Sequence, residues 1–276
     1  MPWGSERETV LVERIGHVAH VRLNRPEKRN AIDGAMFAEL RAVALEIAAT
    51  PAVRAVVLSG AGGTFCSGID IGALASMGSG EVDADTVANT ATLERSAQGA
   101  TPFQQVAWLW HEMPAPVIAA VEGHAVGGGL HIALAADLRV IAPGARVGFA
   151  EVGWGLVPDL SGTQSLRRLV RLDVAKRLVL TGELIGGAEA VELGLATLLD
   201  DDPVGRALTM AAAIAERSPD AVRAAKRLLD DAALVDVADG LAAEVTAAAS
   251  LVGTANQVEA AIARFEGRPP VFTDPA

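Results

Sequence analysis

The chain of 276 residues is 51% hydrophobic, which is enough for a sizeable core in one large domain or in a domain with an appendage. Its net charge of −11, from 34 acidic and 23 basic residues, argues against nucleic acid as a main partner, because phosphate binding needs a basic face. The single cysteine, Cys66, excludes an internal disulfide and favours a reduced, cytoplasmic setting. No apolar run approaches the roughly 20 residues of a membrane span. Residues 1–10 lack the basic start and apolar core of a signal peptide, so we expect neither a membrane span nor a signal peptide.

The first quarter of the chain predicts a hairpin, a helix and a buried strand. Thr9–Arg14 and Val18–Asn24 mix β-branched and polar residues and predict two strands of a hairpin, which Pro26 ends. Asp33 is placed to cap a following helix. Val53–Leu58 is an apolar, β-branched run that is typical of a strand buried on both faces.

The middle of the chain repeats the order of strand, glycine loop and helix. The expected elements are a helix over Val106–Met113, a strand over Val117–Val121, a glycine-rich turn over Gly123–Gly129, a helix over Leu130–Ala136 and a strand over Leu138–Ile141. Helices thus lie between strands, which predicts an α/β core with a parallel sheet. Residues 77–101 are polar with little periodicity and are expected to be the most flexible segment.

The last third of the chain is mainly helical. Leucines near helical spacing predict short helices after Gly162, and Leu195–Leu199 predicts one last strand. Alanine-rich segments beyond them predict further helices, among them Val237–Phe265, an arm of the kind that packs on another subunit. We therefore expect a core over residues 1–200 and a helical C-terminal region over residues 201–276.

Two glycine-rich loops each follow a predicted strand and precede a helix. They are Thr64–Asp70 and Gly123–Leu130, and the second contains three successive glycines. A helix start exposes unpaired N–H groups and the positive end of a dipole, and glycine lets the backbone approach a ligand closely. Two such donors aimed at one oxygen form an oxyanion hole. Either loop taken alone could equally be an ordinary turn, and neither fits a dinucleotide or nucleotide-phosphate motif.

An ordered set of short motifs runs through the chain. In chain order they are Asn24-Arg25-Pro26, Asn30-Ala31, Phe65-Cys66-Ser67-Gly68-Ile69-Asp70, Pro116–Val121, Gly127-Gly128-Gly129, Glu151, Gly155-Leu156-Val157-Pro158, Gly162-Thr163-Gln164 and Leu180-Thr181-Gly182. The set resembles the crotonase (enoyl-CoA hydratase/isomerase) superfamily over about residues 8–270. The resemblance implies a crotonase-like (ClpP/crotonase) α/β fold: a spiral of ββα units with a helical C-terminal trimerisation region. It also implies a homotrimer or a dimer of trimers.

The resemblance further implies an acyl-coenzyme A site. The family's oxyanion donors match the backbone N–H groups of Ile69 and Gly128, which would hold the thioester oxygen as it becomes an enolate. Coenzyme A would lie over the first loop, with its phosphates near a basic cluster that could otherwise be a solvated turn. The residues implied for CoA or substrate contact are Arg25, Lys28, Arg29, Ala31, Cys66, Ser67, Gly68, Asp70, Gly127, Trp154, Phe265 and Arg268. Of these, Cys66 could instead be a packed residue and Asp70 a helix cap, and the last two belong to a segment that resembles one that reaches the CoA of a neighbouring subunit in the family.

The chain departs from the family's hydratases in its acid–base groups. Those enzymes use two glutamates that bracket a water molecule. The later one matches Glu151, but the position 20 residues earlier holds His131, which could serve as a general base or be a packed residue. Asp159 lies eight residues after Glu151, where dienoyl-CoA isomerases also have an aspartate, and it could otherwise be a turn residue after proline. The match is partial, because those isomerases carry a further aspartate at the position of His131.

The sequence therefore predicts an enoyl-CoA hydratase/isomerase-type enzyme that acts on unsaturated acyl-CoA thioesters. Glu151 is the main acid/base, and Asp159 or His131 is the second. Because the hydratase pair is incomplete, double-bond isomerisation is slightly favoured. Hydration with His131 in place of the first glutamate is one alternative, and a non-catalytic acyl-CoA-binding protein is another. We expect coenzyme A only as part of the substrate, with no permanently bound cofactor and no metal, and we expect neither nucleic acid nor a membrane as partner.

Overall fold

The main sheet has six strands in the order β1-β2-β3-β4-β6-β9. The computed structural model describes residues 7–70, 72 and 94–275. The strands are β1 (Val10–Ile15), β2 (Val18–Leu23), β3 (Ala55–Gly60), β4 (Val117–Val121), β6 (Leu138–Ile141) and β9 (Leu198–Leu199). The predicted hairpin is confirmed, since β1 and β2 pair antiparallel, and the other neighbours pair in parallel.

A smaller sheet lies beside the second glycine loop. Its strands, in the order β5-β7-β8, are β5 (His124–Val126), β7 (Arg146–Gly148) and β8 (Ile185–Gly186). The prediction of a turn over Gly123–Gly129 was wrong at β5, because these residues pair in parallel with β7. The strand predicted over Leu195–Leu199 is likewise shortened to the two residues that pair with β6.

Helices follow most of the strands. They are α1 (Gly34–Ala48), α4 (Pro102–His111), α5 (Gly128–Ala135), α6 (Gly162–Leu166), α7 (Leu172–Thr181), α8 (Gly187–Glu192), α9 (Pro203–Ala215), α10 (Pro219–Ala232), α11 (Val237–Leu251) and α12 (Ala255–Glu266), with short 3-10 helices η1 (Pro26–Lys28), η2 (Ala61–Gly63) and η4 (Glu151–Trp154). The predicted cap of α1 is confirmed, because the Asp33 carboxylate accepts a hydrogen bond from the Met36 N–H at 2.9 Å. Residues 77–93 of the segment expected to be flexible lie outside the described residues.

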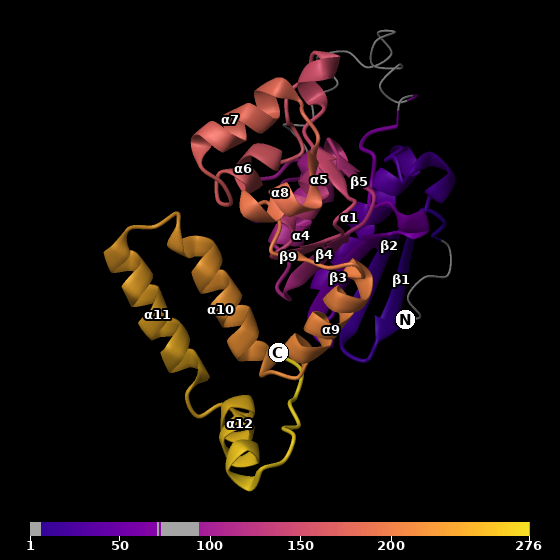
Figure 1. Cartoon of the computed structure of the whole chain (residues 1–276). Coiled ribbons are helices and arrows are strands. Elements are labelled where there is room, and N and C mark those ends of the chain that lie inside the picture. The colour runs from indigo at the N-terminus through magenta and orange to yellow at the C-terminus, as the bar shows by residue number, and fades with distance from the viewer. Residues whose placement is uncertain (1–6, 71, 73–93, 276) are drawn as a thin grey trace.

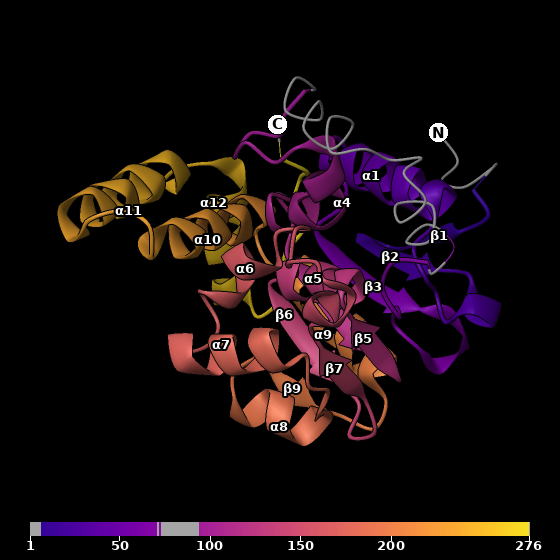
Figure 2. The same ribbon diagram turned by 90° about the horizontal axis from the view of Figure 1, so that it is seen from above.

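Helices cover both faces of the main sheet, as the two views in Figures 1 and 2 show. Val56 and Ala119 pack on one face against side chains of α1, α4 and α5. Val57 and Ala120 pack on the other face against Ala207 and its neighbours on α9. The predicted domain boundary at residue 200 therefore precedes a helix that packs as part of the core.

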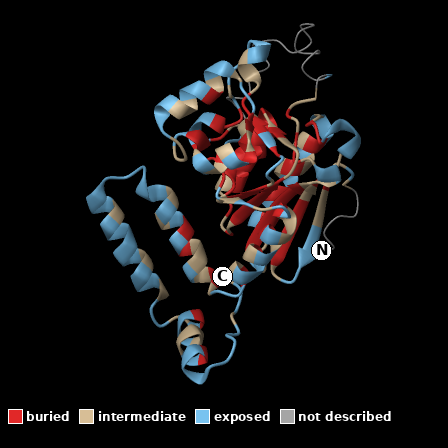
Figure 3. Cartoon of the chain, in the orientation of Figure 1, coloured by how far each residue is buried: buried red, intermediate tan, exposed pale blue. Residues whose placement is uncertain are grey.

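The helices α10, α11 and α12 project from this core as an arm (Figure 1). Figure 3 shows α11 exposed over most of its length, and none of its residues is buried. The single helix predicted over Val237–Phe265 is in fact two, because Gly253 takes a positive φ of 79° and Thr254 caps α12. The mixed α/β fold with a helical C-terminal region is confirmed.

A buried ion pair joins α10 to the core. The Lys226 ammonium lies 2.7 Å from Asp137 Oδ2, which also accepts the Val117 N–H at 2.6 Å. Both side chains are largely buried. Asp230, one turn further along α10, has its pKa raised to about 6 by burial, against the lowering effect of the Lys226 charge. The junction of arm and core is therefore sensitive to charge.

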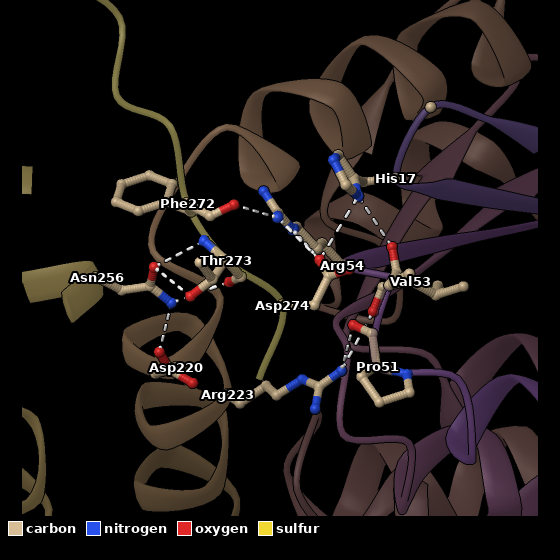
Figure 4. A network of polar contacts seen from close by, with 12 residues as sticks. His17, Pro51, Val53, Arg54, Asp220, Arg223, Asn256, Phe272, Thr273 and Asp274 are labelled. Carbon is tan, nitrogen blue, oxygen red and sulfur yellow. Dashed lines mark hydrogen bonds and ion pairs between the residues drawn. The ribbon is translucent and has the colours of Figure 1, made fainter. Parts of the chain in front are cut away.

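The end of the chain returns from α12 to the main sheet and is fixed there by polar contacts (Figure 4). Asn256 on α12 accepts the Thr273 N–H at 2.9 Å and donates to Asp220 on α10 at 2.7 Å. Arg54, just before β3, donates to the Asp274 carboxylate at 2.9 Å. These bonds connect the last described residues to both the arm and the core.

Candidate active site

The two glycine loops are hydrogen-bonded to each other. The Cys66 N–H donates to the His124 carbonyl at 2.8 Å, and the Val126 N–H donates to the Cys66 carbonyl at 3.0 Å. This close approach requires glycine at position 129, because a Cβ there would lie 2.4 Å from the Cys66 carbonyl oxygen. The first loop is thereby held against the start of α5.

Ile69 and Gly128, the predicted oxyanion donors, lie side by side at this contact. The Ile32 N–H donates to the Gly68 carbonyl at 2.8 Å, and the Asp70 N–H donates to the Ile32 carbonyl at 2.9 Å. These two backbone bonds hold the chain on either side of Ile69. In the described part of the chain, the N–H groups of Ile69 and Gly128 make no hydrogen bond. A Cβ on Gly128 would lie 3.5 Å from Ile69 Cδ1, so the two residues are neighbours. Two unbonded N–H groups on adjacent segments, one of them at a helix start, suit a developing oxyanion.

His131 lies one turn into α5 and is completely buried. Its Nε2 is 3.1 Å from Glu151 Oε1, a close polar contact that is not aligned as a hydrogen bond. The ring tilts against Phe149 with centroids 5.4 Å apart. Gly162, at the start of α6, packs so closely that a Cβ there would lie 2.6 Å from His131 Nε2. The structure thus brings His131 and Glu151 together and closes the imidazole off from solvent.

Glu151 and Asp159 are the two predicted carboxylates, and their pKa values shift in opposite directions. Burial alone would raise the pKa of Glu151, but interactions with His131 and with backbone N–H groups outweigh burial and lower it. Asp159 is exposed at its surface, yet desolvation by the surrounding protein raises its pKa, and the Glu151 charge adds to the rise. The surroundings of the two carboxyl groups therefore favour the ionised form of Glu151 and the protonated form of Asp159.

Residues 160–162 contribute to the site, although the sequence interpretation gave them no role. Leu160 Cδ1 would lie 3.0 Å from a Cβ on Gly128, so this side chain covers the oxyanion donor. Ser161 has a φ of 68° and a buried hydroxyl. An apolar residue next to Asp159 could have suggested a pocket wall. A serine gives no sequence signal of a left-handed backbone, because that region favours glycine.

Arg25, from the predicted CoA cluster, is engaged within the protein. Its guanidinium donates to the Ala31 carbonyl and lies 3.3 Å from Asp70 and 3.2 Å from Asp33. Asp70 also accepts the Gly72 N–H at 2.9 Å, and this bond, with Arg25, lowers the pKa of its carboxyl. Arg25 therefore fastens the first loop to the start of α1.

Lys28 and Arg29 remain as exposed cations beside the first loop. Neither forms an ion pair with a described residue. Ser67 is half-buried, and its hydroxyl bonds to the Lys28 carbonyl at 3.4 Å. Cys66 is fully buried, and burial raises the pKa of its thiol to about 12, so the thiol packs and does not react.

Glycines 68 and 127 turn the chain at the two loops. Gly68 and Gly127 have φ of 99° and 53°, and a Cβ on Gly127 would lie 3.4 Å from Glu151 Oε1. Trp154 stands three residues after Glu151 on η4 and is 59% exposed. Of these residues, Gly127 directly adjoins the carboxylate of Glu151.

Phe265 and Arg268 are not brought to this site. Phe265 is in the last turn of α12 and Arg268 follows that helix, which lies at the far end of the molecule from α5 in Figure 1. Phe265 is 93% exposed, and Arg268 pairs with Glu259 and Glu266 at 2.6 Å. Any contact they make with CoA would be with that of another subunit.

The described residues contain neither a cluster of metal ligands nor a helix that could span a membrane. No group of three or more His, Cys, Asp or Glu side chains is placed to hold a metal ion in residues 7–70, 72 and 94–275. Over the same residues, every helix is too short or too polar to cross a membrane.

Comparison with known proteins agrees with this geometry. The sequence model of the enoyl-CoA hydratase/isomerase family matches residues 13–275. YngF of Bacillus subtilis, which is named an enoyl-CoA hydratase/isomerase, is 35% identical over 93% of this chain and 94% of its own. The short-chain-enoyl-CoA hydratase of Clostridium acetobutylicum is 34% identical over 95% of this chain and 97% of its own. The crystal structure of enoyl-CoA hydratase from Bacillus anthracis superposes with a TM-score of 0.86 at 31% identity, covering 96% of this chain and 98% of that one.

Proposed function

The chain belongs to the enoyl-CoA hydratase/isomerase (crotonase) family, and on that premise we propose that it moves a double bond within an unsaturated acyl-CoA thioester. The thioester oxygen accepts the N–H groups of Ile69 and Gly128 and carries negative charge as the enolate forms. One carboxylate removes a proton from the acyl chain, and the other returns a proton at a different carbon.

The two carboxyl groups divide this work by their pKa values. Glu151, whose pKa is lowered, is the base that takes the proton from the acyl chain. Asp159, whose pKa is raised, is the acid that delivers one. The opposite directions of the two shifts favour transfer of the proton from Glu151 to Asp159, which resets the site. His131 acts as the fixed partner of Glu151.

The observation that carries the proposal is the contact of 3.1 Å between His131 and Glu151. Because His131 is completely buried against Glu151, it is poorly placed to activate a water molecule by itself. Asp159 is then the second acid–base group, and a pair of carboxylates can shuttle a proton without adding water.

Hydration of a 2-enoyl-CoA is the second candidate, because relatives at 31% and 34% identity are named enoyl-CoA hydratases. In that reaction Glu151 would take a proton from water, and Asp159 or His131 would supply the other acid–base group. The same oxyanion donors serve both reactions, so the substrate class does not distinguish them.

Products formed in heavy water distinguish the two reactions. The purified protein is incubated with 2-enoyl-, 3-enoyl- and dienoyl-CoA, and the products are weighed by mass spectrometry. Deuterium uptake without added water supports isomerisation, and the gain of one water supports hydration. Detectable binding with no product from any substrate would instead support a non-catalytic acyl-CoA-binding protein.

We propose coenzyme A as part of the substrate only, with no further cofactor. Lys28 and Arg29 are exposed beside the first loop and supply the charge that its phosphates need. Replacement of both by alanine is expected to raise KM for acyl-CoA several-fold with little change in kcat. A cytoplasmic location is proposed from the single, reduced Cys66.

We also propose that the arm assembles the chain into a homotrimer or a dimer of trimers. Its helices expose large apolar side chains at Leu229, Val237, Leu241, Val245 and Phe265. An apolar surface of this kind on an extended arm favours a protein partner. Sedimentation equilibrium of the purified chain tests the assembly, and a monomer at micromolar concentration would contradict it.

A further inference from the structure

Ser161 has a backbone conformation that serine rarely adopts. Its φ of 68° and ψ of 1° place it in the left-handed region, directly before α6. The other described non-glycine residues with positive φ are Arg29 and Asn30, and the Asn30 side chain bonds to the Thr64 carbonyl at 2.6 Å. Glycine would take the conformation of Ser161 without strain, so the presence of a serine at this position suggests that its hydroxyl has a role.

The Ser161 hydroxyl does not cap the helix that it precedes. It stands at the N-cap of α6 but caps no N–H group of that helix. The residue is more than nine-tenths buried, and its oxygen has no hydrogen-bond partner. Buried polar groups are nearly always bonded, and an exception at a reaction site points to a functional role.

Neighbouring residues place Ser161 beside the acid–base groups. Leu160 before it reaches Gly128, and Gly162 after it lies against the ring of His131. Glu151 contacts His131 through Oε1, while its Oε2 is also buried and has no partner. A hydroxyl is a donor and a carboxylate oxygen is an acceptor, so the two unpartnered groups are complementary.

We propose that Ser161 is a positioning residue that acts through Glu151: its hydroxyl donates to Glu151 Oε2 through one bridging water molecule. The bond keeps the carboxylate ionised and oriented toward the substrate. This inference rests on the proposed role of Glu151 as the base. The titratable groups that face Glu151 are His131 from α5 and Asp159 from the segment before α6.

Two substitutions remove the hydroxyl with different effects on the backbone. Ser161→Gly relieves the left-handed strain and Ser161→Ala retains it, so the glycine variant is expected to melt at the higher temperature. Both variants are expected to lose roughly tenfold or more in kcat, since a hydrogen bond to a charged group is lost, with KM changed less than about twofold. Ser165→Ala, which removes another buried serine hydroxyl from α6, is the matched control and is expected to keep wild-type kcat.

The pH profile separates positioning from a purely structural role. Without the hydroxyl, the acidic limb of kcat is expected to move to higher pH, because the ionised form of Glu151 loses a donor. A glycine variant with wild-type kcat beside an impaired alanine variant would show that kcat follows backbone strain, and would overturn the proposal. An unmoved acidic limb in both variants would overturn it as well.

A stability cycle tests the same link without turnover. Melting temperatures are measured at pH 7 for wild type, Ser161→Ala, Glu151→Ala and the double variant. We expect Ser161→Ala to lower the melting temperature clearly in the wild-type background and little in the Glu151→Ala background. Equal shifts in both backgrounds would refute the bond between them. The two proposals can fail separately. If the melting temperatures show coupling but the protein turns over no acyl-CoA, the contact between Ser161 and Glu151 is supported and the proposed function is refuted.

Discussion

Gly162→Ala tests whether the contact between His131 and Glu151 matters for catalysis. A Cβ at residue 162 would lie 2.6 Å from His131 Cδ2 and Nε2, whereas ordinary contacts begin at 3.4 Å. The ring must therefore retreat by about 0.8 Å, the difference between these distances. Its Nε2 is now 3.1 Å from Glu151 Oε1, so a displacement of this size changes the contact substantially.

The expected result is a loss of about 100-fold in kcat, since a misplacement near 1 Å at a reaction site has effects of this order. Overpacking of the site is expected to cost about 1–3 kcal/mol of stability. A melting temperature lowered by roughly 2–10 °C would correspond to this cost in a chain of this size. Steady-state kinetics with the substrate identified in heavy water, and thermal melting, measure the two effects.

Gly153→Ala is the matched control, because a Cβ there meets no atom within 4 Å although it lies two residues from Glu151. It is expected to keep wild-type kcat and melting temperature. Wild-type kcat in Gly162→Ala, with a crystal structure that shows the ring displaced, would refute the reasoning. The contact between His131 and Glu151 would then have no part in the chemistry.

Other predictions concern the carboxylates and the arm. Glu151→Gln is expected to lower kcat by about 100-fold or more, as loss of a general acid–base group does, and unchanged steady-state kinetics would exclude that role. The kcat profile of the wild type is expected to fall with decreasing pH as Glu151 protonates and with increasing pH as Asp159 loses its proton, and residual activity of Asp159→Asn should lack the alkaline limb. Lys226→Ala leaves Asp137 as an unpaired buried charge and should cost about 3–5 kcal/mol in denaturant unfolding; a loss below about 1 kcal/mol would mean the pair is solvated. Burial raises the pKa of Asp230 to about 6, so its stabilising neutral form is present below pH 3.8 and lost as pH rises through 6; Asp230→Asn should raise the melting temperature at pH 8 but not at pH 4.

Elements with local signals could be predicted from the sequence. Asp33 caps α1 and the apolar run near β3 is a buried strand, because each depends on a few adjacent residues. β5 was missed because its residues look like part of a glycine turn and become a strand only by pairing with β7. The break at Gly253 was missed because alanine-rich sequence on both sides continues the helical pattern. These features depend on contacts between distant segments or on a single backbone angle.

The candidate site divides in the same way. Spacing within the family motifs identified Glu151 as a candidate acid–base group and showed that His131 stands where the family's hydratases have a glutamate. It did not show that the two side chains contact each other. Arg25 looked like a phosphate ligand because the sequence shows its charge and not its carboxylate partners Asp33 and Asp70. Ser161 gave no signal, since its backbone angle and buried hydroxyl appear only in three dimensions.

A histidine where the family's hydratases have a glutamate changes the electrostatics of the whole site. Two neighbouring carboxylates repel, and the pKa of one of them rises. Here the contact with His131 helps to lower the pKa of Glu151, while desolvation and the Glu151 charge raise the pKa of Asp159. In the proposed mechanism the imidazole therefore does more than fill the space of a missing glutamate: its contact with Glu151 favours the base role for Glu151 and leaves the acid role to Asp159. This division gives the acid at position 159 a use and lets a buried His131 contribute without titrating itself.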